Sequence, residues 1–162
     1  MNLLWIGGGV LAGVALGVGL AWRPLRAALR ERQFQRARKL FHQQRERLEA
    51  KFLALAAASG KPRGLRWTDC EFENAVAYAR DRRTHDVTAF VGVTISFEAI
   101  EGGPMEGVEA VGNLRAATAV FQFHGERWET GGRAVFNLNP AQAIEYYRDD
   151  FEMIVEGAAQ RS

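Results

Sequence analysis

The stretch VTAFVGVTISFEAI, residues 87–100, decides the fold class of this 162-residue chain. Val, Ala, Ile or Phe stands at every second position from Val87 to Phe97. Thr and Ser fill several of the intervening positions, and Glu98 follows them. A period of two residues predicts a strand with one buried face and one more polar face, as in antiparallel sheets.

Shorter segments of the same kind flank this strand on both sides. A polar turn, residues 80–86, precedes it, and an acidic, glycine-rich loop, residues 101–113, follows it. The predicted strands are residues 72–78, 87–100, 114–123 and 133–138. Sequential strands joined by such connections favour an antiparallel meander, and its apolar face needs a helix to cover it.

A helix is predicted directly after the last strand. Asn139 is a good N-cap, Pro140 suits the first helical position, and Gln142 stands where a capping box places it. Its expected buried face is Ile144, Tyr147, Phe151 and Ile154. The fold class is therefore α+β, similar in outline to cystatin-like or nuclear-transport-factor-like curved sheets. That similarity of outline carries no function.

The chain opens with twenty residues, 3–22, that include no charged side chain. As a helix they would be about 30 Å long, the thickness of the hydrocarbon core of a bilayer. Trp5 and Trp22 stand near the ends, where indole rings favour the membrane interface. Six glycines between Gly7 and Gly19 disfavour a helix in water, and no basic residue precedes Leu3 as in a signal peptide. We therefore expect residues 1–22 to be a transmembrane anchor, with a cleaved signal peptide or a soluble helix as alternatives.

Positive charge after the anchor predicts its orientation. Seven Lys and Arg residues fall between Arg23 and Lys39, and the chain after Trp22 is therefore expected in the cytoplasm. Within the anchor, Gly9, Gly13 and Gly17 recur every four residues. Such a stripe lets two helices approach closely in lipid, so it predicts a homo-oligomer through the anchor.

Residues 23–59 are predicted to form a basic juxtamembrane helix. Residues 23–58 hold ten Lys and Arg against three Glu, a net charge of +7, whereas residues 59–162 hold eleven against sixteen acidic residues, a net of −5. Apolar residues recur at helical spacing from Leu25 to Leu55 but are too often interrupted for a coiled-coil seam along the whole helix. Gly60 and Pro62 stop the helix, so the domain is expected over residues 60–162.

Three roles compete for this basic helix. Its charges could serve only to set topology in solvent, or they could lie along the inner leaflet of the membrane. The arginines expected to contact anionic lipid are Arg26, Arg30, Arg36 and Arg38. Nucleic-acid binding is the third role, but no interleaved aromatic residues or binding motif support it, so nucleic acid is not expected as a partner.

Residues able to do chemistry are few in this sequence. His42, His85 and His124 share no spacing of a metal site, and neither a metal nor another cofactor is predicted. The lone Cys70 is expected to behave as a small buried apolar residue rather than a nucleophile. Asp69, Glu71 and Glu73 alternate along a strand and predict a solvated edge. No catalytic residue is therefore assigned.

Polar residues of the last strands form the candidate ligand site. Arg133 and Asn137 stand at alternate positions of their predicted strand, so their side chains are expected on one face. If the sheet curves, Arg115 and Trp128 are expected beside them. The alternative is that Asn137 serves only the turn into the helix. The sequence therefore favours a membrane-anchored, non-enzymatic binding or scaffolding protein with an unidentified protein partner. The alternative function is a small-molecule-binding or hydrolytic domain with a pocket on the curved sheet.

Overall fold

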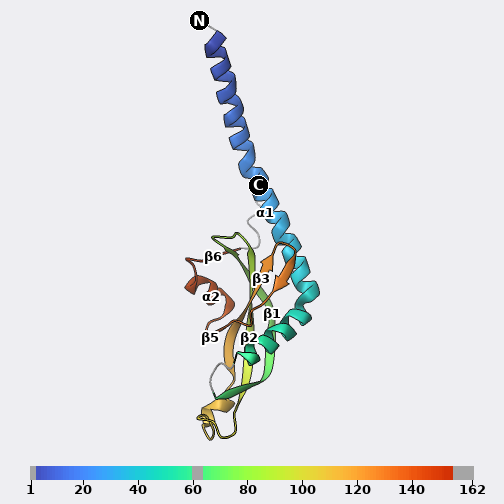
Figure 1. The fold of residues 1–162 in the computed structure, drawn as a ribbon, viewed down its shortest axis with the longest axis vertical. Coiled ribbons are helices and arrows are strands. Elements are labelled where there is room, and N and C mark those ends of the chain that lie inside the picture. Colours follow the sequence, from blue (N-terminus) through green and yellow to red (C-terminus); the bar gives the residue numbers. More distant parts are fainter. Residues whose placement is uncertain (1–2, 60–63, 155–162) are drawn as a thin grey trace. The chain divides into compact units, whose positions relative to one another are not determined.

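The computed structural model describes residues 3–59 and 64–154, and of residues 3–21, 23 and 110 it describes the backbone alone. The chain divides into two compact units, Met1–Lys39 and Leu40–Ser162. Figure 1 shows the helices α1 and α2 and the strands of the sheet.

Helix α1 runs without a break from Leu3 to Ala58, with Pro24 inside it. The basic helix predicted over residues 23–59 therefore continues the helix of residues 3–22 without a break at Pro24. A proline removes one backbone hydrogen bond, but strong helix formers on both sides, including Ala21 and Leu25, keep the backbone helical. No coiled coil is evident in the described part of the chain.

The predicted membrane anchor concerns the first part of this helix. Among the side chains that the structure describes, no helix is long and apolar enough to cross a membrane. Apart from its helical backbone and the Trp22 side chain, the uncharged stretch of residues 3–22 lies outside those described residues. The anchor therefore stays a prediction.

The second unit contains one antiparallel sheet of six strands. Its strands are β1 (Leu65–Asp81), β2 (Val87–Ala99), β3 (Arg115–His124), β4 (Arg127–Glu129), β5 (Ala134–Phe136) and β6 (Phe151–Met153). The order across the sheet is β4-β3-β2-β1-β6, and β5 also pairs with β3. The α+β class and the antiparallel meander of the first strands are thus confirmed, but the sheet has two more strands than the predicted four.

Two short strands account for that difference. β4 follows the tight turn after β3, with Phe123 opposite Trp128. β6 pairs with the end of β1, where Ala79 stands opposite Met153. Residues 151–153 were predicted to continue the last helix, but α2 (Pro140–Tyr146) ends before them. The chain turns there, with the Phe151 N–H donating to the Tyr147 carbonyl oxygen at 2.9 Å.

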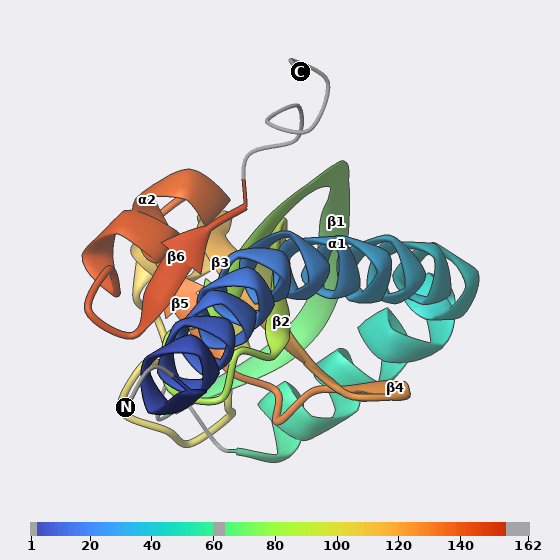
Figure 2. The same ribbon diagram turned by 90° about the horizontal axis from the view of Figure 1, so that it is seen from above.

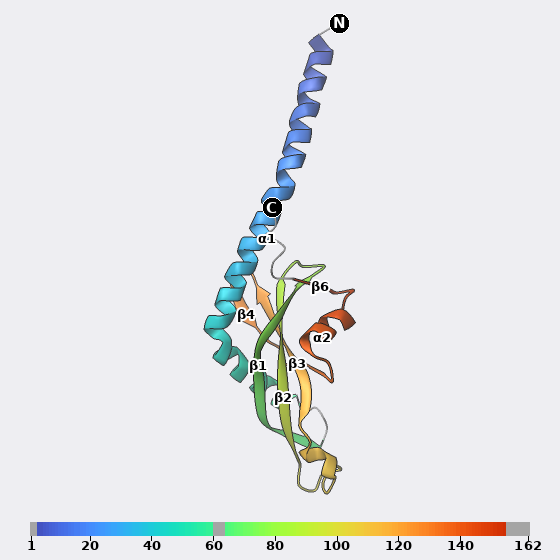
Figure 3. The same cartoon turned by 180° about the vertical axis from the view of Figure 1, so that it is seen from behind.

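Each face of the sheet is covered by a different helix. On one face, Phe41 and Phe52 of α1 are fully buried. The Phe41 ring centroid lies 4.9 Å from that of Trp128, and the Phe52 ring centroid lies 5.7 Å from that of Phe72. On the other face, Ile144 of α2 packs in a cluster with residues that include Phe90. Figures 2 and 3 show α2 and the end of α1 on opposite sides of the strands.

The predicted capping box at the start of α2 is confirmed. The Asn139 side chain accepts from the Gln142 backbone N–H at 2.9 Å, and the Gln142 side chain accepts from the Asn139 N–H at 3.1 Å. Pro140 occupies the first turn, as expected. These bonds satisfy helix N–H groups that would otherwise have no partner, which fixes where the helix begins.

A bulge in β1 ties this strand to α1. The pairing with β2 shifts between Phe72 and Val76, so that residues 73–75 face the single residue Gly92. The Arg45 guanidinium donates to the Asn74 carbonyl oxygen at 2.9 Å and also to the carbonyl oxygen of Glu73. Since these carbonyls have left the ladder, Arg45 supplies the partners that the sheet no longer provides.

Candidate functional site

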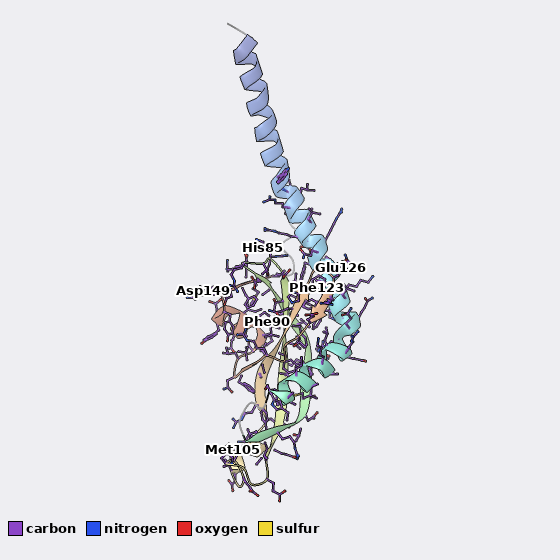
Figure 4. The ribbon with its side chains drawn as sticks, viewed as in Figure 1. His85, Phe90, Met105, Phe123, Glu126 and Asp149 are labelled. Atoms are coloured by element: carbon purple, nitrogen blue, oxygen red, sulfur yellow. The ribbon has the colours of Figure 1, made fainter. Side chains whose placement is uncertain are left out.

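A cavity of about 290 Å³ lies at one end of the sheet. It is lined by Leu65, Phe97, Met105, Val111, Arg115, Phe136 and Asn137. These residues come from the start of β1, the end of β2, the start of β3, the end of β5 and the loop between β2 and β3. Figure 4 labels Met105 in that loop, at the far end of the domain from His85.

The wall of the cavity continues the aromatic core beneath α1. The Trp67 ring centroid lies 6.4 Å from that of Phe52, which belongs to α1. It also lies 5.3 Å from Phe97 and 6.3 Å from Phe136, and both of these line the cavity. Because α1 ends at Ala58, the last rings of this row are covered by the β2–β3 loop instead of a helix.

Gly64 holds that loop close to the sheet. Its φ of +77° is a conformation that suits glycine, and a Cβ there would lie 3.1 Å from the Met105 Cγ. Its carbonyl oxygen also accepts from the Ile100 N–H at 3.0 Å. The close approach therefore places Met105 over the start of β1, as part of the cavity wall.

Two polar side chains, Arg115 and Asn137, share the cavity lining. Both are exposed, so they stand where the cavity meets solvent. Asn137 has a φ of 61°, and its backbone N–H donates to the Ala116 carbonyl oxygen at 2.9 Å, which keeps it beside the start of β3. A guanidinium and a carboxamide at the mouth of an apolar cavity can donate hydrogen bonds to an acceptor group of a ligand.

Of the four residues of the candidate ligand site, the structure brings Arg115 and Asn137 together. Trp128 is buried, with its ring centroid 5.2 Å from that of Phe123 and close to Phe41. Arg133 places its guanidinium carbon 4.7 Å from the centroid of the Tyr147 ring. Neither Trp128 nor Arg133 lines the cavity.

Sequence reasoning did not find the apolar lining residues of the cavity. Phe97 and Phe136 stand at alternating positions that are typical of buried strand residues. That alternation does not distinguish a filled core from the wall of a cavity. Met105 and Val111 lie in a loop that reads as acidic and glycine-rich. The one available signal was the presence of large apolar residues, Met105, Val108 and Val111, within that loop.

The predicted membrane-contact residues belong to α1. Arg26 and Arg30 are exposed, and the Arg26 guanidinium carbon lies 5.0 Å from the centroid of the Trp22 ring. Arg36 is exposed and Arg38 is half-buried, and each has interactions with other groups. The predicted helix-packing stripe, Gly9, Gly13 and Gly17, lies within residues 3–21, of which the structure describes the backbone alone.

Exposed apolar side chains accompany these arginines along α1. Trp22, Leu25 and Leu29 are 54%, 57% and 55% exposed. At 3.6 residues per turn, positions 22, 25 and 29 fall on one side of a helix, and Arg26 and Arg30 fall along one border of that side. We refer to Trp22, Leu25 and Leu29 as the apolar stripe.

Cys70 and Asp81 of the second unit have shifted pKa values. Burial raises the pKa of the Cys70 thiol to about 11, and the Asp69 carboxylate adds to the shift. His124 Nδ1 lies 3.7 Å from Asp86 Oδ2. Backbone N–H groups of the following turn, Thr84 above all, lower the pKa of Asp81. Among the described side chains, no group of three or more His, Cys, Asp or Glu residues could hold a metal ion.

Compared with protein-family models, with curated proteins and with solved structures, the chain matches none of them.

Proposed function

We propose that this chain is a single-pass membrane protein whose N-terminal helix holds a non-enzymatic binding domain in the cytoplasm. The apolar stripe of α1 is the observation that carries the membrane part of the proposal. Its three exposed side chains begin at the last residue of the uncharged stretch and continue beyond it, and Arg26 and Arg30 border them. Aromatic and apolar side chains beside arginines are typical of helices at the membrane interface, where the arginines meet anionic headgroups.

The cytoplasmic orientation follows from the same charges. Lys and Arg close to the end of a span favour the cytoplasmic side, and seven of them lie between Arg23 and Lys39. The glycine stripe of Gly9, Gly13 and Gly17 further supports a homo-oligomer through the anchor. Cross-linking of the full chain in membranes is expected to trap dimers, and Gly13→Leu is expected to reduce them.

Extraction of membranes from cells that express the full chain tests the anchor. We expect the chain to stay in the membrane pellet after a wash with alkaline carbonate, and a C-terminal tag to be protected from protease in intact cells. Brominated lipids are expected to quench Trp22 fluorescence most when bromine is near the headgroups, measured as the difference from Trp22→Phe. Release into the supernatant, or a tag exposed outside the cell, would contradict the proposal.

A second candidate function, small-molecule binding, is favoured by the cavity at the end of the sheet. Five of its seven lining side chains are apolar, and Arg115 and Asn137 stand at its mouth. Apolar walls with a few polar groups are typical of ligand sites. Arg115 carries a guanidinium and Asn137 a carboxamide, so these two side chains suit the binding of a ligand better than its hydrolysis.

A further inference from the structure

We propose that the cavity binds a small carboxylate with an apolar body, whose carboxylate is held by Arg115 and Asn137. The inference rests on the proposed binding role of the domain and names the class of ligand. The apolar body would lie against Phe97, Phe136 and Met105, within the cavity.

The size of the cavity sets the size of the ligand. Its volume of about 290 Å³ falls at the lower limit for ligand pockets, which range from about 300 to 1,000 Å³. It has room for roughly ten groups the size of a water molecule, at about 30 Å³ each. An arylalkyl or short-chain acid therefore fits, whereas a drug-sized molecule or a long acyl chain does not.

The polarity of the lining sets the chemistry of the ligand. Arg115 is the one charged side chain that lines the cavity among the residues described, so an anionic group is favoured over an amine. A guanidinium matches the two oxygens of a carboxylate, and the Asn137 amide adds a further donor. Arg115 also has an interaction with another group of the protein, and a guanidinium has five N–H donors, so it can serve both that group and a ligand carboxylate.

The position of Arg115 also limits the affinity. Because Arg115 and Asn137 are exposed, a bound carboxylate keeps part of its hydration and is not fully desolvated. The apolar body is removed from water against the aromatic wall, and this burial provides the rest of the binding free energy. Binding therefore needs both the carboxylate and the apolar body of the ligand, and a neutral analogue with the same body is expected to bind more weakly.

Trp67 provides a reporter for this site. Its ring contacts Phe97 and Phe136, which line the cavity, whereas Trp128 lies in the core beneath Phe41. The full chain, labelled with 5-fluorotryptophan in a neutral detergent, contains four tryptophans. Its fluorine spectrum is titrated with 3-phenylpropionate and with the neutral 3-phenylpropionamide, and Trp67→Phe assigns the Trp67 signal.

We expect 3-phenylpropionate to shift the Trp67 signal saturably, to leave the Trp128 signal in place, and to bind about tenfold more tightly than the amide. Arg115→Gln is expected to remove that preference and to leave the affinity for the amide unchanged. Arg133→Gln is the matched control, because it removes the same charge from a side chain that stacks on Tyr147. Asn137→Gly keeps the backbone conformation at φ 61° and is expected to weaken the carboxylate about threefold.

Three results would overturn the proposal: no saturable shift of the Trp67 signal, equal affinity for the acid and the amide, or equal effects of Arg115→Gln and Arg133→Gln. An unchanged Trp128 signal in each variant shows that the core is still folded. A chain that resists the carbonate wash but lacks the Trp67 response refutes the ligand alone. A chain that is released by carbonate and still responds refutes the anchor alone.

Discussion

Replacement of Phe41 by Ala is expected to destabilise the second unit more than any single change on the surface of α1. The Phe41 side chain is fully buried, and its ring packs edge-on against three rings of the sheet at centroid distances of 4.9, 5.5 and 6.2 Å. Truncation of a buried Phe to Ala costs about 3–5 kcal/mol, and the three ring contacts place this site at the upper end of that range. The loss is a large fraction of the 5–15 kcal/mol by which domains are typically stable.

Urea unfolding of the full chain in a mild detergent, followed by near-ultraviolet circular dichroism, measures this loss. With a slope of about 1.5–2 kcal/mol per molar urea, the midpoint is expected to fall by about 2–3 M. Lys51→Ala, on an exposed position of the same helix, is the control and is expected to change the free energy of unfolding by at most about 0.5 kcal/mol. A loss below about 1 kcal/mol for Phe41→Ala would refute the packing of residues 40–58 on the sheet.

Three further changes test separate parts of the domain by the same unfolding measurement. A Cβ at Gly132 would lie 2.7 Å from the Ala56 backbone nitrogen, whereas a Cβ at Gly125, which has a similar positive φ, would meet open space. Gly132→Ala is therefore expected to cost about 1–3 kcal/mol more stability than Gly125→Ala. Asn139→Ala is expected to cost about 1 kcal/mol through loss of the helix cap, and Asn139→Asp, which can still cap, much less. Burial raises the pKa of Cys70 from 9.0 to about 11, so at pH 8 its alkylation by iodoacetamide is expected to be about 100-fold slower than in the unfolded chain. Because the folded state favours the neutral thiol, this stabilisation is present below pH 9 and lost as the pH rises through about 11, and Cys70→Ala is expected to remove that part of the pH dependence.

The elements predicted best from sequence are those with strong local signals. The two-residue period from Val87 to Phe97 corresponds to β2, because a strand at the centre of a sheet shows its buried face in every second residue. Asn139, Pro140 and Gln142 identify the start of α2, because a cap uses hydrogen bonds between near neighbours in the chain. Arg115 and Asn137 were singled out as polar residues on neighbouring strands, and the sheet places them at one cavity.

The elements that were missed depend on contacts between distant residues. β6 has only three residues and exists because it pairs with the end of β1, and Phe151 packs on Phe90 at 5.4 Å. Its apolar residues also fit the helical spacing that begins at Ile144, so local periodicity favoured the wrong element. The start of β1 was missed because residues 65–71 include exposed charged residues, and these obscure the alternation with the half-buried Trp67.

The cavity itself follows from a mismatch between the lengths of a helix and a strand. The part of α1 from Phe41 to Ala58 is about 26 Å long at 1.5 Å per residue, whereas the thirteen residues of β2 extend about 44 Å. One helix segment therefore cannot cover the whole face, and the rings of Phe97 and Phe136 remain beyond its end. The β2–β3 loop covers them with Met105 and Val111, but a loop fills space less closely than a helix with regularly spaced side chains. A longer helix would have filled this end of the core, so the end of α1 at Ala58 is what leaves Arg115 beside an open apolar space.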